Sequence, residues 1–138
     1  MTADALPLEK DPLYLVDDDN DLRNELADAL EDAGYVVRGF DSGEAFLAVE
    51  AELAPGCVIL DLTMPGMNGM QVHTTLTERS SAHVVVMLTG TGSIPTAVSA
   101  LRTGVIDFVE KPAQLDMLKA SIETARVRRL AAAASSER

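Results

Sequence analysis

The stretch CVILDLTMPGMNG, residues 57–69, decides the fold of this chain. It opens with four apolar residues and reaches one acid, Asp61, before turn residues interrupt it at Pro65-Gly66 and again at Gly69. A short apolar run bounded by turn residues is typical of a strand that is buried on both faces. The stretch therefore predicts a central strand with Asp61 at its carboxyl end, where ligands bind in open α/β sheets. A simpler interpretation, in which Asp61 only caps the following turn, stays open at this point.

Size and composition narrow the class of protein. The 138 residues suffice for about one domain, and 47% hydrophobic with 24% charged residues is typical of a globular protein. A formal net charge of -11 argues against direct nucleic-acid binding, which needs clustered Lys and Arg. Residues 1–11 lack the apolar core of a signal peptide, so we expect an N-terminal arm there. No apolar run is long enough for a membrane helix, and the single Cys57 excludes an internal disulfide, so we expect a cytoplasmic protein.

Apolar runs and helical patterns alternate along the chain. Apolar runs predict five strands, at residues 13–16, 35–40, 57–60, 84–88 and 105–109. Apolar residues at helical spacing predict five helices, at residues 22–33, 46–53, 70–76, 94–101 and 115–125. This alternation predicts a single doubly wound α/β domain over residues 12–129, with a five-stranded parallel sheet and helices on both faces. We expect residues 130–138 to form a tail or the start of a linker.

Polar residues follow four of the predicted strands. All strands of a parallel sheet end at one edge, so we expect Asp17, Asp18, Asp61, Thr89 and Lys111 to lie close together. Converging carboxylates repel one another unless a cation joins them, and Mg²⁺ prefers oxygen ligands. A Lys ammonium can hold a phosphoryl oxygen, and an Asp carboxylate can become an aspartyl phosphate. Together, these residues predict Mg²⁺-dependent phosphoryl transfer. Each residue taken alone is also explained by its place at the start of a helix, in a turn or at the end of a strand.

Four ordered motifs resemble the receiver domain of two-component response regulators. They are LVDDD at 15–19, LDLTMPGMNG at 60–69, LTGTG at 88–92 and DFVEKP at 107–112. The segments TGTGSIPTAV and DFVEKP are most similar to FixJ-type and NtrC-type receivers. The resemblance covers about residues 12–129 and implies a flavodoxin-like (βα)5 fold with strand order 2-1-3-4-5. It also implies a switch in a phosphorelay, not an enzyme with an external substrate: the domain phosphorylates and dephosphorylates only itself.

The resemblance assigns roles to the acidic residues. Asp61 matches the phosphoacceptor, which takes a phosphoryl group from a sensor histidine kinase. Asp18, Asp61 and the backbone carbonyl of Thr63 match the protein ligands of Mg²⁺. Asp17 and Asp18 match the family's acidic pair, and Asp17 is expected to act on the metal mainly through water.

The resemblance also implies a route from the phosphate to the surface. Thr89 and Lys111 match the residues that hold the phosphoryl oxygens, and the Lys111-Pro112 bond is expected to be cis. Phe108 matches an aromatic residue that turns inward when Thr89 moves toward the phosphate, although plain core packing explains Phe108 equally well. The fourth helix, fifth strand and last helix, residues 94–125, would then change how the domain forms a homodimer or controls a transcriptional output.

Two other classes of protein share part of this pattern. Phosphatases of the haloacid-dehalogenase type place a nucleophile and a second acid two residues apart, as Asp17 and Asp19 are, but also need an acidic pair beyond the lysine, where Asp116 is the single aspartate. Flavin-binding electron carriers of the same fold need a Ser-, Thr- and Gly-rich phosphate loop after the first strand. That loop is acidic here and would repel a phosphate unless a metal intervened.

Overall fold

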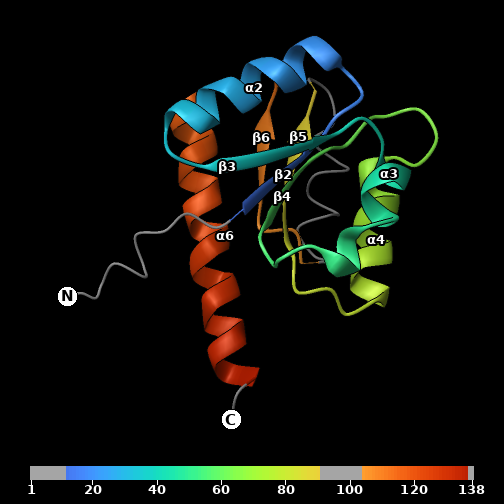
Figure 1. Cartoon of the computed structure of the whole chain (residues 1–138), viewed down its shortest axis with the longest axis vertical. Helices are drawn as coiled ribbons and strands as arrows, with labels where there is room; N and C mark the ends of the chain where they lie inside the picture. The colour runs from blue at the N-terminus through green and yellow to red at the C-terminus, as the bar shows by residue number, and fades with distance from the viewer. Residues whose placement is uncertain (1–11, 91–103, 137–138) are drawn as a thin grey trace.

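The computed structural model describes residues 12–90 and 104–136, with the side chains of the last helix described as far as residue 132. Five parallel strands form one sheet: β2 (Pro12–Val16), β3 (Val36–Phe40), β4 (Cys57–Asp61), β5 (Val84–Thr89) and β6 (Asp107–Glu110). Their order is β3-β2-β4-β5-β6, which is 2-1-3-4-5 along the chain and confirms the predicted fold (Figure 1). The predicted arm at 1–11 and the predicted helix at 94–101 lie outside the described residues.

Helices cover both faces of the sheet. On one face lie α2 (Asn20–Asp32) and α6 (Leu115–Ser136), and on the other lie α3 (Gly43–Leu47) and α4 (Gly69–Glu78) (Figure 1). Successive side chains of a strand point to opposite faces. In β4, Val58 and Leu60 therefore pack with α3 and α4, whereas Cys57 and Ile59 pack with α2 and α6. This double burial explains why the strand is apolar without interruption.

The helix predicted at 46–53 is shorter than its apolar pattern suggested. Ser42 caps α3 through a hydrogen bond from the Ala45 N–H, but α3 ends at Leu47 and a short 3-10 turn follows at Glu50–Glu52. Arg79 causes the interruption, because its Nη1 donates to the Leu47 carbonyl at 2.9 Å and to Glu50 Oε1 at 3.0 Å. The prediction was wrong here because the ion pair between buried Glu50 and the exposed Arg79 side chain, with the Arg79 bond to the Leu47 carbonyl, took the place of the continuing helical hydrogen bonds.

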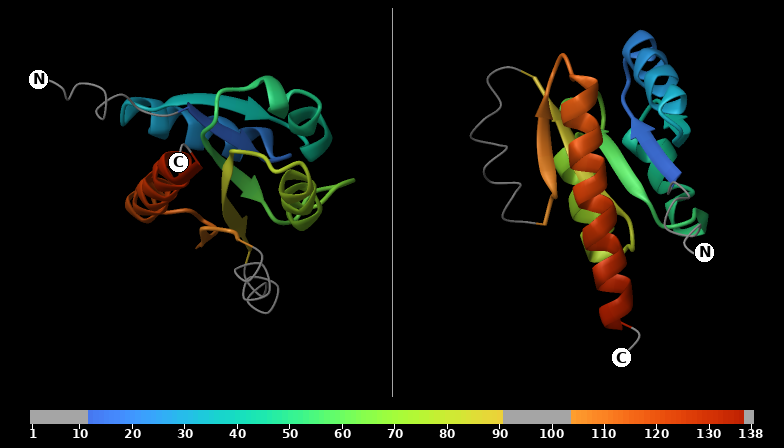
Figure 2. Two further views of the ribbon diagram at one scale, coloured as in Figure 1. Left: turned by 90° about the horizontal axis from the view of Figure 1, so that it is seen from below. Right: turned by 90° about the vertical axis from the view of Figure 1, so that its left-hand side faces the viewer.

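The last two elements differ from the prediction at their ends. The fifth strand begins at Asp107 and not at residue 105, although the Ile106 N–H already donates to the Val85 carbonyl at 2.8 Å. The last helix, α6, runs unbroken to Ser136, so the predicted boundary at residue 129 falls inside a helix. The end of α6 extends past the sheet (Figure 2). Among the described helices, none has both the length and the apolar composition needed to cross a membrane.

Candidate functional site

Four predicted site residues stand at the carboxyl ends of neighbouring strands. Asp17 follows β2, Asp61 and Thr89 are the last residues of β4 and β5, and Lys111 follows β6. Asp17, Asp61 and Thr89 are buried. The Lys111 N–H donates to the Thr89 carbonyl at 2.8 Å, which continues the strand pairing to the site. The parallel sheet therefore brings to one edge residues that lie far apart in the sequence.

One ammonium group joins two buried carboxylates. Lys111 Nζ lies 3.2 Å from Asp17 Oδ2 and 3.2 Å from Asp61 Oδ2. The pKa of Asp61 is raised to about 6, first by burial and then by the Asp17 carboxylate, although Lys111 and the Thr63 N–H counteract both. Burial lowers the pKa of Lys111, but the charges of Asp61 and Asp17 outweigh burial, so its pKa is raised. Lys111 therefore keeps its positive charge, and the two acids remain an electrostatically unfavourable pair.

Three carboxylates at this edge fit a cation. Oxygens of Asp17, Asp18 and Asp61 all lie within 4.8 Å of one another, with Asp18 exposed and the other two buried. Asp17 Oδ2 is close to the Lys111 ammonium but accepts no aligned hydrogen bond from any described residue. A buried carboxylate oxygen whose neighbouring cation is shared with Asp61 is incompletely satisfied, and a divalent cation or its bound water would complete its coordination. A set of carboxylate oxygens matches the ligands that Mg²⁺ prefers.

The loop after β4 is held against the Asp61 carboxylate. The Thr63 N–H donates to Asp61 Oδ1 at 3.2 Å, and Thr63 itself is exposed. The Gly69 N–H donates to the Leu62 carbonyl at 2.9 Å and closes the loop. A Cβ at Gly69 would lie 2.6 Å from the Asp61 carbonyl oxygen, so only glycine fits there. The stretch PGMNG thus serves to turn the chain closely around the acid.

The predicted switch residues are near the site but do not contact the carboxylates in this structure. The Thr89 hydroxyl donates to the Gly90 carbonyl at 3.2 Å. Phe108 is half-buried and packs against the core cluster on the α3 and α4 face. The Lys111-Pro112 bond is cis, as the resemblance implied.

Sequence reasoning missed one side chain that contacts the acidic loop. Arg23, in the first turn of α2, donates from Nη1 to the Asp17 carbonyl at 2.6 Å and from Nη2 to Asn20 Oδ1 at 2.6 Å. From the sequence alone, an arginine among acids at a helix start is expected to be a solvent-exposed charge. Only its contact with the Asp17 backbone distinguishes it.

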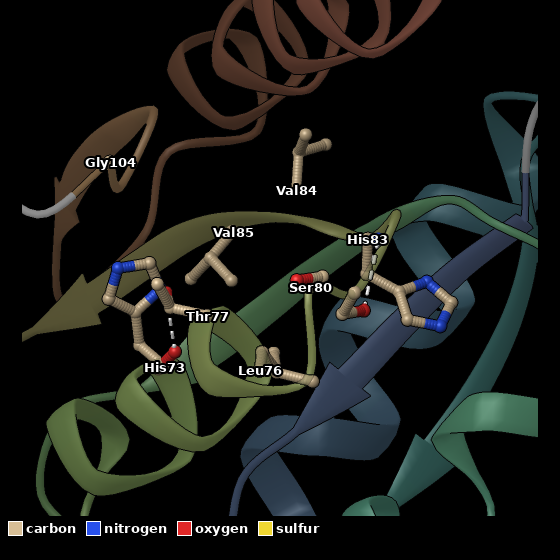
Figure 3. A pocket seen from close by; sticks show the side chains of 9 residues that line it. His73, Leu76, Thr77, Ser80, His83, Val84, Val85 and Gly104 are labelled. Carbon is tan, nitrogen blue, oxygen red and sulfur yellow. Dashed lines mark hydrogen bonds between the residues drawn. The ribbon is translucent and has the colours of Figure 1, made fainter. Parts of the chain in front are cut away.

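A hollow of about 300 Å³ lies away from these residues, beside the start of β5 (Figure 3). It is lined by His73, Leu76, Thr77, Ser80, Ser81, His83, Val84, Val85 and Gly104. The His83 ring is held in the fold, because Nδ1 accepts from the Gly56 N–H at 3.2 Å and Nε2 lies 3.0 Å from the Glu50 carbonyl. None of the predicted site residues lines this hollow.

Known proteins match most of this chain. A family model described as the response regulator receiver domain matches residues 13–123. The transcriptional regulatory protein FixJ of Bradyrhizobium diazoefficiens is 39% identical over 128 residues, which cover 93% of this chain and 62% of that protein. The C4-dicarboxylate transport transcriptional regulatory protein DctD of Pseudomonas aeruginosa is 39% identical over 119 residues, which cover 86% of this chain and 26% of that protein. The chain thus spans less than two thirds of either relative.

Solved structures agree with the sequence matches. The crystal structure of FixJ-N has a TM-score of 0.79 and 34% identity, covering 83% of this chain and 91% of that one. The receiver domain of NtrX from Brucella abortus has a TM-score of 0.76 and 36% identity, covering 82% of this chain and 96% of that one. These matches do not support the phosphatase alternative, and the side chain of Asp19 is already used to cap α2. The chain belongs to the family of response regulator receiver domains, of the type found in the transcriptional regulators FixJ and DctD.

Proposed function

We propose that this domain is a switch that takes a phosphoryl group from a sensor histidine kinase on Asp61. The observation that carries the proposal is the buried Asp17–Asp61 pair, with one Lys111 ammonium 3.2 Å from an oxygen of each acid. Two buried carboxylates so close are unfavourable unless cations neutralise them, as Lys111 does in part and bound Mg²⁺ would do further. We assign Asp18, Asp61 and the Thr63 carbonyl as Mg²⁺ ligands, with Asp17 acting through water. Bound Mg²⁺ would neutralise the negative charge on the carboxylates and phosphoryl oxygens.

The protein's own residues position and neutralise the reacting groups. The Asp61 carboxylate attacks phosphorus, an oxygen–phosphorus bond forms, and the bond from phosphorus to the kinase imidazole breaks. The Lys111 ammonium, already beside Asp61 Oδ2, holds one phosphoryl oxygen. The Thr89 hydroxyl exchanges its Gly90 acceptor for another phosphoryl oxygen. The domain is its own phosphoacceptor: it takes the phosphoryl group from the donor onto Asp61 and later loses it by hydrolysis, so it modifies no other protein.

The signal leaves through movement of Thr89 and Phe108. Once the Thr89 hydroxyl turns toward the phosphate, the half-buried Phe108 can move further inward, which shifts an equilibrium between two states of the domain. The face of residues 94–125 then changes its affinity for a second copy or an output partner. The relatives' names support a transcriptional output, and we propose that the domain acts in the cytoplasm. We place the domain at residues 12–129, between an arm at 1–11 and a tail or linker at 130–138.

Labelling with acetyl phosphate tests this assignment. Wild-type protein with Mg²⁺ is expected to take up one acyl phosphate per chain, and Asp61→Asn is expected to take up none. Asp41→Asn is the matched control, because Asp41 is an exposed acid that follows β3 at the same edge of the sheet. An Asp61→Asn protein that still takes up label would refute the assignment, as would a wild-type protein whose labelling does not depend on Mg²⁺.

A further inference from the structure

We infer that Arg23 is a positioning residue for the metal site and that residue 39 is glycine so that the Arg23 side chain can cross β3. The inference rests on the proposed function, since it concerns the cation that Asp17, Asp18 and Asp61 would hold. It goes beyond that function, because Arg23 touches neither the carboxylates of the site nor the phosphoryl group.

Arg23 ties the acidic loop to helix α2. Its Nη1 donates to the Asp17 carbonyl at 2.6 Å, its Nη2 donates to Asn20 Oδ1 at 2.6 Å, and its backbone N–H donates to the Asp19 carbonyl at 2.9 Å. One residue therefore binds both ends of the turn between β2 and α2. The planar guanidinium donates to two separate acceptors, which fixes direction as well as distance.

The remaining polar atoms of Asp17 show what this contact orients. Its N–H donates to the Phe40 carbonyl at 3.1 Å, and its Oδ1 accepts from the Asp19 N–H at 2.9 Å. With the carbonyl held by Arg23, only Oδ2 is left, and it faces Lys111 at 3.2 Å. Every other polar atom of Asp17 thus helps to aim one oxygen at the site. Loss of the Arg23 contact would free the peptide that sets this direction.

Gly39 supplies an independent observation. A Cβ at Gly39 would lie 3.1 Å from Arg23 Cδ and 3.3 Å from Arg23 Nε, which is too close unless the arginine shifts. Gly39 pairs with Leu15 in the interior of a strand, where glycine weakens the strand and often marks a close approach. Its φ is not in the left-handed region, so backbone conformation does not require glycine. The neighbour that an added methyl group would displace is the Arg23 side chain, by a few tenths of an ångström.

Charge and position predict opposite results for the loss of Arg23. A guanidinium near three carboxylates repels a cation, so removing its charge would by itself strengthen Mg²⁺ binding. Removing a contact that orients a ligand weakens metal binding, by about 10-fold in typical cases. The sign of the change therefore separates the two effects.

The experiment is an MgCl₂ titration of the whole chain, followed by amide chemical shifts, with unfolding measured in parallel in EDTA. Arg23→Ala is expected to raise the Mg²⁺ dissociation constant by about 10-fold. Arg23→Lys keeps the charge but lacks the planar fork that reaches the Asp17 carbonyl and Asn20 Oδ1 together, and is expected to lie between Arg23→Ala and wild type. Arg38→Ala is the matched control, because Arg38 is an exposed arginine of β3 whose guanidinium lies over the Phe40 ring. It should stay within about 2-fold of wild type.

Gly39→Ala closes the test. It is expected to weaken Mg²⁺ binding in the wild-type background, because the added methyl group displaces Arg23, and to have no further effect in Arg23→Ala. Unchanged or stronger Mg²⁺ binding by folded Arg23→Ala overturns the inference, as does equal loss from Gly39→Ala in both backgrounds. A lower stability in EDTA with unchanged Mg²⁺ affinity also overturns it, because Arg23 would then be merely structural. A wild-type chain that binds no Mg²⁺ overturns both this inference and the proposed function, whereas failure of the variants alone leaves the proposed function standing.

Discussion

The carboxylate of Asp61 is held where its charge is unfavourable. Its side chain is 5% exposed, and burial followed by the Asp17 charge raises its pKa to about 6. Because the pKa in the unfolded chain is near 3.8, the contribution of Asp61 to stability is fully present below about pH 4 and is lost as the pH rises through about 6. At neutral pH the buried charge of Asp61 therefore destabilises the metal-free protein, and a bound cation would reduce this cost.

Asp61→Asn should accordingly stabilise the metal-free protein. We expect the free energy of unfolding in EDTA to rise by on the order of 1–3 kcal/mol at about pH 8, because a neutral amide removes the cost of burying a charge and then the repulsion from Asp17. The gain should shrink as the pH falls through about 6 and Asp61 in the wild type binds a proton. Urea unfolding from about pH 5 to 8 measures both effects. A gain that did not depend on pH, or the same gain in Asp41→Asn, would contradict the electrostatic explanation.

The residue scale also shows which parts of the site a sequence can predict. Asp17, Asp61 and Lys111 could be placed because each stands at the end of an apolar run and parallel strands end together. The direction of the Thr89 hydroxyl and the reach of Arg23 could not be predicted, since neither follows from spacing. A side chain that binds a backbone carbonyl six residues away leaves no periodic pattern.

At the scale of elements, residues that follow α4 stabilise the end of the short helix α3. Glu50 is 4% exposed in its side chain, and it is bound by Arg79 at 3.0 Å and by the Ser81 hydroxyl at 3.3 Å. Arg79 also donates to the Leu47 carbonyl, which satisfies the end of α3. The sequence pattern at 46–53 is apolar at helical spacing, and the burial of an acid within it could not be read from that pattern. The wrong helix length follows from this one contact.

Arg79→Ala should therefore destabilise the protein without affecting the metal site. We expect a loss of about 1–3 kcal/mol, because Glu50 remains buried with fewer donors and the end of α3 loses its partner. A cycle with Glu50→Gln is the sharper measurement, since a neutral amide should reduce the cost of losing Arg79. Chemical denaturation gives the free energies, and the Mg²⁺ dissociation constant should match that of wild type. Additive effects of the two changes would contradict a direct Glu50–Arg79 contribution.

At the scale of the molecule, the alternation of strands and helices determines more than any single residue does. Five apolar runs separated by helical patterns allow few topologies, because parallel connections are right-handed, and the order 2-1-3-4-5 follows once the family resemblance is added. The extent of α6 did not follow. Of the described α6 side chains, the last in the buried core is that of Ala125, but the helix continues to Ser136 and extends past the sheet. The end of the apolar pattern therefore did not mark the end of the helix. The same helix leaves large apolar side chains uncovered, among them Met117 at 57% exposure.

The proposed homodimer gives the last prediction. Met117 lies within the face of residues 94–125, so Met117→Asp should weaken dimers that form with beryllofluoride and Mg²⁺ by at least about 10-fold, because an unpaired charge is costly in a dry interface. Val36→Asp is the matched control: Val36 is 67% exposed on β3, at the edge of the sheet opposite β6. Sedimentation velocity over a concentration series measures the association. Dimers that persist in Met117→Asp but are lost in Val36→Asp would place the interface on the β3 edge. If activated wild-type protein stayed monomeric, the proposed homodimer would be wrong, and the face of residues 94–125 would bind an output partner and not a second copy.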